Sequence, residues 1–341
     1  SLAPRILLAD PYLRHVLGFS LGQALLSTLL SLGLAIPVAR ALARRRFVGR
    51  TLLIKLFGLS LVLPVIIAIF GIVAVHGKQG WLPQLLRSLG LDLGNYLYGL
   101  FGILLAHVFF NMPLATRLLL QSLESIAVEQ RQLAAQLGMN GWQHLRWVEW
   151  PYLRRQILPT AALIFMLCFA SFATVLSLGG GPQATTIELA IYQALSYDYD
   201  LGRAALLALI QLGCCLGLVV LSLRLNTVLA VGNTHDQLWR SQQDSYCSRI
   251  SDALLIGAAL LLMVPPLLAV VIDGSNQTML AVLQQSALWQ AFFTSLTIAI
   301  GAGLLCVTLT MMLLWSSREL KLRQQMAAGQ AVQLLQQQGA A

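Results

Sequence analysis

The side chains that could do chemistry are few in this chain, and their spacing fits no catalytic or metal-binding motif. The five cysteines follow no metal-ligand spacing, and Cys214 and Cys215 are adjacent, so a helix would point them to different faces. Neither a Gly-x-Ser-x-Gly nucleophile elbow nor a Gly-x-x-x-x-Gly-Lys-Ser/Thr phosphate loop occurs in the sequence. The sequence therefore predicts no catalytic residue, no metal site and no cofactor, and it predicts that the chain itself does not hydrolyse ATP.

His107 and Asn111 form a polar pair inside an apolar stretch. They are four residues apart, so they share one face of a helix. Polar side chains in a membrane face a solute pathway or the bundle interior, where interhelical hydrogen bonds fix the packing, and both interpretations stay open here. Gly179, Gly180 and Gly181 end the next apolar stretch abruptly, and solute entry could pass near them.

The elements that must position these residues are membrane-spanning helices. The chain is 57% hydrophobic and 10% charged, with a mean hydropathy of +0.75, which is too apolar for a soluble globule of 341 residues. A helix needs about 20 apolar residues to cross the hydrocarbon core, and continuous runs indicate helices because lipid leaves backbone groups no other partner. Seven such runs occur, at residues 17–39, 56–75, 98–119, 157–178, 204–223, 253–272 and 289–315. The predicted fold class is an all-α, polytopic transmembrane bundle.

The distribution of Lys and Arg predicts the orientation of the spans. Six basic residues lie within 40–55 and four within 131–155, whereas 181–201 and 273–288 contain none. Short cytoplasmic connections are enriched in Lys and Arg, so the N-terminus of this chain is predicted to be periplasmic and its C-terminus cytoplasmic, in a bacterial inner membrane. Topology and contact with membrane lipids account for the net charge of +9, and no nucleic-acid partner is predicted.

A polar stretch at residues 132–151 is predicted to form two short helices hinged at a glycine. Gly138 follows an apolar helical face at the position of a C-cap, and Asn140 and Gln143 have the spacing of an N-capping box. The second helix is predicted to end at Pro151. An amphipathic connector is one interpretation; the other is a docking element for an external motor, favoured because no acidic residue lies inside the predicted spans to drive transport with an ion gradient.

This stretch resembles the cytoplasmic loop of importer-type (MetI-like) ABC permeases. Their pattern is Glu-Ala-Ala, three residues, Gly, nine residues and Ile-x-Leu-Pro; here Gly138 and Pro151 match in spacing, while Gln132 replaces the acidic residue. The resemblance implies a coupling helix that binds an ATP-binding subunit, within a loop at 120–158. The residues it assigns to coupling are Glu129, Gln132, Leu133, Ala134, Gly138, Val148, Trp150 and Pro151.

Longer stretches, at 104–113 and 167–200, resemble the permeases of bacterial thiamine and thiamine pyrophosphate ABC transporters. The resemblance implies uptake of that solute, a dimeric ATP-binding subunit, a periplasmic solute-binding protein and two homologous halves in one polypeptide. Residues 1–225 are expected to be a first half lacking its first span, 226–250 a cytoplasmic linker and 251–341 the truncated start of a second half. The alternatives are a fused permease for ferric iron, or a carrier or membrane-assembly protein outside the ABC class.

An aromatic and acidic group is predicted on the periplasmic side, beyond the fourth span. It comprises Tyr192, Tyr197, Asp198, Tyr199 and Asp200. These side chains could attract a cationic thiazolium ring, or they could belong to the interfacial aromatic belt and contact the solute-binding protein.

Overall fold

The computed structural model describes residues 11–60, 62–92, 94–179, 181, 184–225, 246–275 and 277–338. All regular elements in these ranges are helices, so the predicted all-α class is confirmed. They divide into two compact units, residues 1–273 and 274–341. The helices of the first unit are α2 (Pro11–Arg44), α3 (Arg50–Leu59), α4 (Val65–His76), α5 (Trp81–Ser88), α6 (Leu100–Glu124), α7 (Val128–Gln136), α8 (Gly141–His144), the π-helix η1 (Leu145–Glu149), α9 (Trp150–Phe169), α10 (Phe172–Leu178), α11 (Ile187–Ser196), α12 (Leu201–Leu225) and α13 (Tyr246–Gly274).

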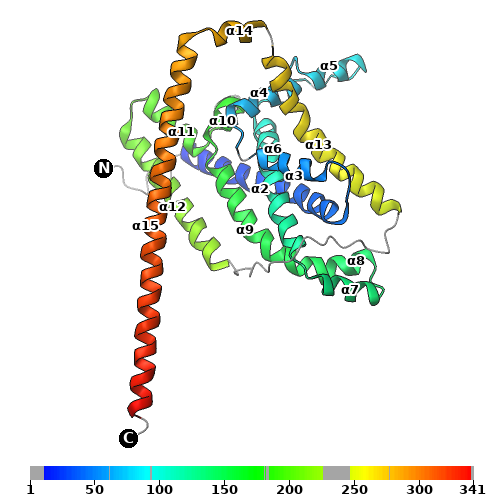
Figure 1. Cartoon of the computed structure of the whole chain (residues 1–341). Coiled ribbons are helices and arrows are strands. Elements are labelled where there is room, and N and C mark those ends of the chain that lie inside the picture. Colours follow the sequence, from blue (N-terminus) through cyan, green and yellow to red (C-terminus); the bar gives the residue numbers. More distant parts are fainter. Residues whose placement is uncertain are drawn as a thin grey trace. The chain divides into compact units, whose positions relative to one another are not determined.

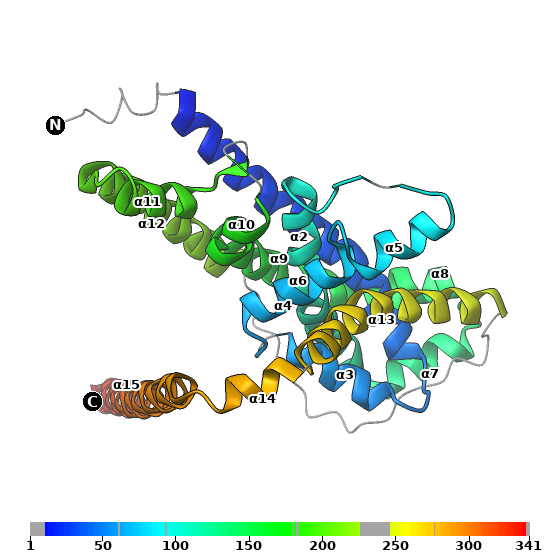
Figure 2. The same cartoon turned by 90° about the horizontal axis from the view of Figure 1, so that it is seen from above.

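The core of the first unit is the packing of α2 against α6 and α9 (Figures 1 and 2). α2 carries small residues along its buried face, including Ala24, Ala35 and Ala39, each fully buried. Small side chains let helix backbones approach closely, which is how membrane helices gain packing contacts without a hydrophobic driving force. Phe109 of α6 and Ile164 of α9 fill the space that remains.

Seven helical segments of the described chain are long and apolar enough to cross a membrane, as the sequence predicts. Their bounds are Pro11–Arg44, Val65–Ser88, Leu100–Glu124, Gly141–Phe169, Leu201–Val220, Tyr246–Gly274 and Ser286–Glu319. Several extend beyond the predicted runs, because a helix continues through polar residues at its ends where its backbone bonds remain satisfied.

The second predicted span, at 56–75, is wrong as a single helix. α3 ends at Leu59 and α4 begins only at Val65, after Pro64. Proline lacks the backbone N–H that would continue the helix and disfavours helical geometry in the residue before it. The candidate span therefore begins at Val65.

The fourth predicted span, at 157–178, is also wrong as a continuous helix. α9 ends at Phe169 and α10 begins at Phe172, with Ala170 and Ser171 outside the helical region of φ and ψ. The break frees the carbonyl of Cys168, which accepts hydrogen bonds from Gln23 Nε2 at 2.9 Å and Ser171 Oγ at 2.8 Å. Lipid offers no hydrogen-bond donor to a free carbonyl, so the side chains of Gln23 and Ser171 supply the donors that the break in the helix makes necessary.

The second unit consists of α14 (Gln277–Leu283) and α15 (Ser286–Gln338). α15 is one uninterrupted helix, drawn in orange to red in Figure 1. All of its described side chains, from Ser286 to Glu319, are exposed. α13, which the sequence analysis assigned to the start of a second half, packs within the first unit. The predicted linker at 226–250 lies outside the described residues as far as residue 245.

Candidate functional site

Residues 128–151, here called the helix-pair segment, turn sharply at Gly138. The Met139 N–H donates to the Ala134 carbonyl at 3.1 Å and the Gly138 N–H donates to the Ala135 carbonyl at 3.0 Å. These two bonds form a Schellman motif, which requires a left-handed residue just after the helix, and Gly138 has φ of 65°. The predicted glycine hinge is confirmed.

The second helix of the pair starts with the predicted capping box. The Gln143 N–H donates to Asn140 Oδ1 at 2.9 Å, and the Asn140 N–H donates to Gln143 Oε1 at 3.0 Å. Two N–H groups that the first helical turn would leave free are thus satisfied reciprocally. The turn from α7 into α8 is therefore fixed by local hydrogen bonds.

The prediction that Pro151 ends this second helix is wrong. α8 passes into η1 and then into α9, and Pro151 lies in the first turn of α9. The Trp150 N–H donates to the Leu145 carbonyl, five residues back, so the extra residue of the π-turn accommodates the N–H that Pro151 lacks. The helix-pair segment is consequently continuous with the fourth candidate span.

A groove of about 380 Å³ runs between α7 and the η1–α9 junction. Leu133 and Leu137 are 56% and 65% exposed beside it, whereas Ala134 and Val148 are buried at its floor. Two other predicted coupling residues, Gln132 and Glu129, are exposed, as is Trp150 at 45%. The complete lining is Gln130, Leu133, Ala134, Leu137, Met139, Trp147, Val148, Pro151, Tyr152 and Arg155.

Arg131 holds the start of α7 against the end of α6. Its guanidinium donates to the Leu123 carbonyl, and the side chain is buried. Burial lowers the pKa of Arg131, and the nearby carboxylates of Glu149 and Glu124 act in the opposite direction. An arginine in this setting stays charged, so it adds a charge-assisted hydrogen bond to a carbonyl that already accepts from the Ile126 N–H at 3.3 Å.

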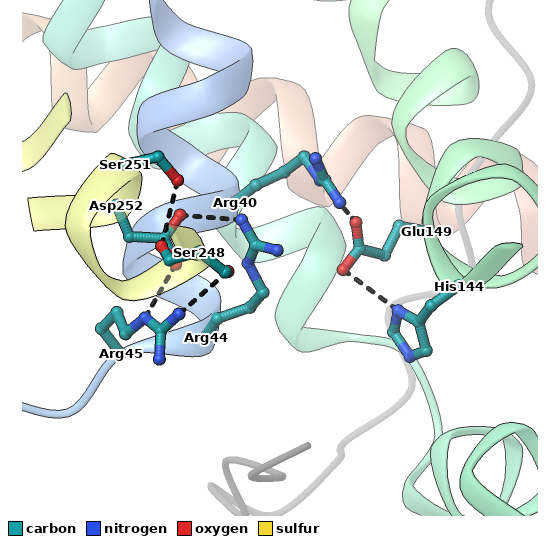
Figure 3. A network of polar contacts seen from close by, with 8 residues as sticks. All are labelled: Arg40, Arg44, Arg45, His144, Glu149, Ser248, Ser251 and Asp252. Atoms are coloured by element: carbon teal, nitrogen blue, oxygen red, sulfur yellow. Dashed lines mark hydrogen bonds and ion pairs between the residues drawn. The ribbon is translucent and has the colours of Figure 1, made fainter. Parts of the chain in front are cut away.

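Two groups of ion pairs surround the C-terminal end of α2 (Figure 3). Arg40 Nε lies 2.6 Å from Glu149 Oε2, and His144 Nδ1 lies 3.2 Å from Glu149 Oε1. In the second group, Asp252 Oδ1 of α13 accepts from Arg44 at 2.8 Å and Asp252 Oδ2 accepts from Arg45 at 2.7 Å. α2 is thereby joined both to the helix-pair segment and to α13.

His107 and Asn111 lie in a polar cluster where α2, α6 and α9 meet. His107 Nδ1 is 2.8 Å from Ser27 Oγ, and Asn111 Nδ2 donates to Cys168 Sγ at 3.2 Å. Both side chains are at most 5% exposed. His107 Nε2 and Gln23 Oε1 have no hydrogen-bond partner among the described residues. The hydrogen bonds of His107 and Asn111 to Ser27 and Cys168 join neighbouring helices and so serve packing. His107 Nε2 and Gln23 Oε1 could bind a polar solute or water.

The residues predicted to make periplasmic contacts surround the turn between α11 and α12. Tyr197 and Tyr199 are 71% and 80% exposed, and the Tyr192 ring lies 6.0 Å from that of Tyr197. Asp200 Oδ1 accepts from the Arg203 N–H at 2.9 Å, which caps α12. Asp198 is exposed in the same turn. Asp200 therefore caps a helix, a role that the sequence analysis did not predict.

The sequence predicted that the glycines at 179–181 end the fourth span, and the structure confirms this for Gly179. α10 ends at Leu178, and the Gly179 N–H donates to the Val175 carbonyl at 2.8 Å. Gly181 has φ of 143°, a conformation open to glycine. Gly180 lies outside the described residues.

Glu149, Arg40 and Asp252 are the residues that sequence reasoning missed. Between Arg131 and Arg155, Glu149 is the one acidic residue of the sequence among four arginines, which was the available signal. The arginine partners of Glu149 and Asp252 are 109 and more than 200 residues away along the chain, so spacing could not reveal them.

Residues 19–230 match the family described as "Binding-protein-dependent transport system inner membrane component". The chain belongs to this family. Among curated relatives, the thiamine transport system permease protein ThiP of Salmonella typhimurium is 65% identical over 95% of the chain, and that of Haemophilus influenzae is 45% identical over 92%. The chain spans 61% and 58% of the length of these two relatives.

Solved structures support the same fold. A chain of a bacterial alginate ABC transporter, in complex with an alginate pentasaccharide-bound periplasmic protein, superposes with a TM-score of 0.55 at 16% identity. The match covers 64% of this chain and 79% of that one. The chain therefore has the fold of an importer-type ABC permease.

Proposed function

We propose that the chain is the membrane permease, or a part of it, of an ABC importer that takes up thiamine or thiamine pyrophosphate. Identity of 65% with a thiamine permease over 95% of the chain is the observation that carries this proposal. In this proposal the chain is a transport subunit, and ATP is hydrolysed by a dimeric ATP-binding subunit on the cytoplasmic side. A periplasmic solute-binding protein delivers the solute.

The helix-pair segment is the proposed docking site for the ATP-binding subunit. Its support is local: a Schellman turn at Gly138 and a capping box at Asn140 fix the shape, and Leu133 and Leu137 expose apolar surface beside a groove. Exposed apolar side chains around a shaped groove are typical of a protein interface. Because η1 and α9 continue the segment without a break in helical structure, a push on it would move a candidate span directly.

The proposed solute pathway borders the polar cluster of α2, α6 and α9. The unpartnered His107 Nε2 and Gln23 Oε1 favour this proposal, since buried polar atoms in a membrane are costly unless another state satisfies them. A pocket of about 400 Å³ between α2, α6 and α13 is lined only by apolar side chains, which suits lipid or protein better than a cationic solute. We also propose that the solute enters near Gly179 to Gly181 and that the tyrosines around Tyr197 contact the binding protein. Both groups would lie on the periplasmic side, together with the N-terminus.

Uptake of radiolabelled thiamine tests the proposed solute. Cells that lack their own thiamine importer would express the complete transporter containing this chain, with wild-type cells and an empty vector as controls. Saturable uptake that excess unlabelled thiamine or thiamine pyrophosphate abolishes is the expected result. Uptake of labelled ferric iron instead, with no thiamine signal, would overturn the choice of solute and favour a ferric-iron permease.

A further inference from the structure

The charged end of α2 holds two different elements at once (Figure 3). Arg40 and Arg44 are one helical turn apart on α2, so they lie on the same side of one rigid helix. Arg40 pairs with Glu149 in η1, and Arg44 pairs with Asp252 in α13. Elements far apart in the sequence therefore meet at a single helix end.

Both carboxylates at this junction are withdrawn from water. The side chain of Glu149 is 6% exposed and that of Asp252 is 0% exposed. A buried carboxylate that loses its cationic partner is left with an uncompensated charge, so these pairs resist separation more strongly than surface ion pairs do. Arg45 adds a second contact to Asp252 at 2.7 Å and one to Ser248 Oγ at 3.1 Å.

The position of Glu149 links this junction to the proposed docking surface. Glu149 is the last residue of η1, two residues before Pro151, and its neighbour Val148 lines the groove beside α7. His144, in α8, approaches the second oxygen of the same carboxylate at 3.2 Å. Displacing the helix-pair segment would therefore pull on Arg40.

We propose that Arg40 and Glu149 are positioning residues that join the helix-pair segment to α2, and that Arg44, Arg45 and Asp252 extend this joint to α13. This inference rests on the proposed function, because it assumes that an ATP-binding subunit moves the segment. The segment, the end of α2 and the start of α13 then move as one body. Two residues in this body change their separation little while the rest of the bundle rearranges.

Distance measurements between encoded spin-labelled amino acids test this joint independently of the solute. One label replaces Gln136, exposed in α7, and the other replaces Leu254, 68% exposed in α13, in the complete transporter with its ATP-binding subunit. The wild-type chain is expected to give one narrow distance distribution that is the same with and without ATP. Arg40→Glu and Glu149→Arg should each broaden it at least twofold, and the double variant should restore the narrow distribution.

Matched variants separate the joint from general instability. Arg154→Glu reverses the charge of an exposed arginine in the first turns of α9 and should leave the distribution narrow. Glu149→Gln, which keeps the size of the side chain but removes its charge, should broaden the distribution even if the charge reversals prevent assembly. A wild-type distance that shifts with ATP, a narrow distribution in Glu149→Gln, or no restoration in an assembled double variant would each overturn the proposal. Absent thiamine uptake in a wild-type transporter with a narrow distribution would instead refute only the proposed solute.

Discussion

Replacing Gly138 by valine should separate the helix-pair segment from its proposed partner without touching any contact in the groove. A Cβ at this position meets no atom within 4 Å, so the cost comes from the backbone alone. Gly138 has φ of 65°, and a residue with a Cβ pays about 1–2 kcal/mol in the left-handed region, with a β-branched one at the upper end. The Schellman turn that sets the direction of α8 is therefore destabilised.

The expected effect on binding follows from this strain. A loss of about 1–2 kcal/mol corresponds to roughly a 5- to 30-fold fall in the population of the native turn relative to a frayed one. We expect the amount of ATP-binding subunit that copurifies from membranes, and the ATP-driven uptake rate, to fall by a similar factor at subsaturating subunit concentration. Copurification measured by quantitative immunoblotting gives the first quantity directly.

Two variants serve as controls for the Gly138→Val experiment. Gly141→Val introduces the same side chain three residues later, at the start of α8, where φ is not positive and a Cβ also meets nothing within 4 Å. Gly138→Asn keeps a residue that tolerates the left-handed conformation, so it should retain most of the association. Association and uptake at wild-type levels in Gly138→Val would refute the idea that this turn presents the docking surface.

Three further substitutions test the contacts around the segment and the polar cluster. Asn140→Ala removes the capping box and should cost about 1 kcal/mol, seen as faster amide hydrogen exchange at Gln143; unchanged exchange would contradict it. Asp252→Asn should lower stability by about 2 kcal/mol because Arg44 and Arg45 lose their charged hydrogen-bond acceptor, measured as a lower midpoint of thermal unfolding in detergent, with exposed Asp198→Asn as the control. Gln23→Leu removes one of the two donors to the Cys168 carbonyl at the α9–α10 break and should cost about 1 kcal/mol in the same assay, whereas a rise in the midpoint would mean that the unpartnered Gln23 Oε1 outweighs the bond.

The sequence predicted the parts of the fold that depend on local chemistry. Apolar runs located seven candidate spans, and the residue types at Gly138, Asn140 and Gln143 predicted the turn and the cap between α7 and α8. Hydropathy could not show where a span is broken, because the break between α9 and α10 is stabilised by Gln23 from another helix. The sequence also predicted a helix end at Pro151, but a π-turn lets the helix continue through this proline.

The ion pairs lay beyond sequence reasoning for a physical reason. Arg40 and Glu149 are 109 residues apart, and nothing local in either stretch requires the other. The basic cluster at the end of α2 was understood only as a sign of topology. Its members Arg40, Arg44 and Arg45 also neutralise two buried carboxylates, which appears only once α2, η1 and α13 are placed together.

ATP-dependent transport into proteoliposomes tests the central claim most directly. The complete transporter would be reconstituted with its ATP-binding subunit and solute-binding protein, and labelled thiamine would be supplied on the side of the binding protein. We predict accumulation against a gradient that requires hydrolysable ATP at the face bearing the helix-pair segment and falls in Gly138→Val but not in Gly141→Val. Thiamine accumulation that proceeds equally without ATP would contradict the account.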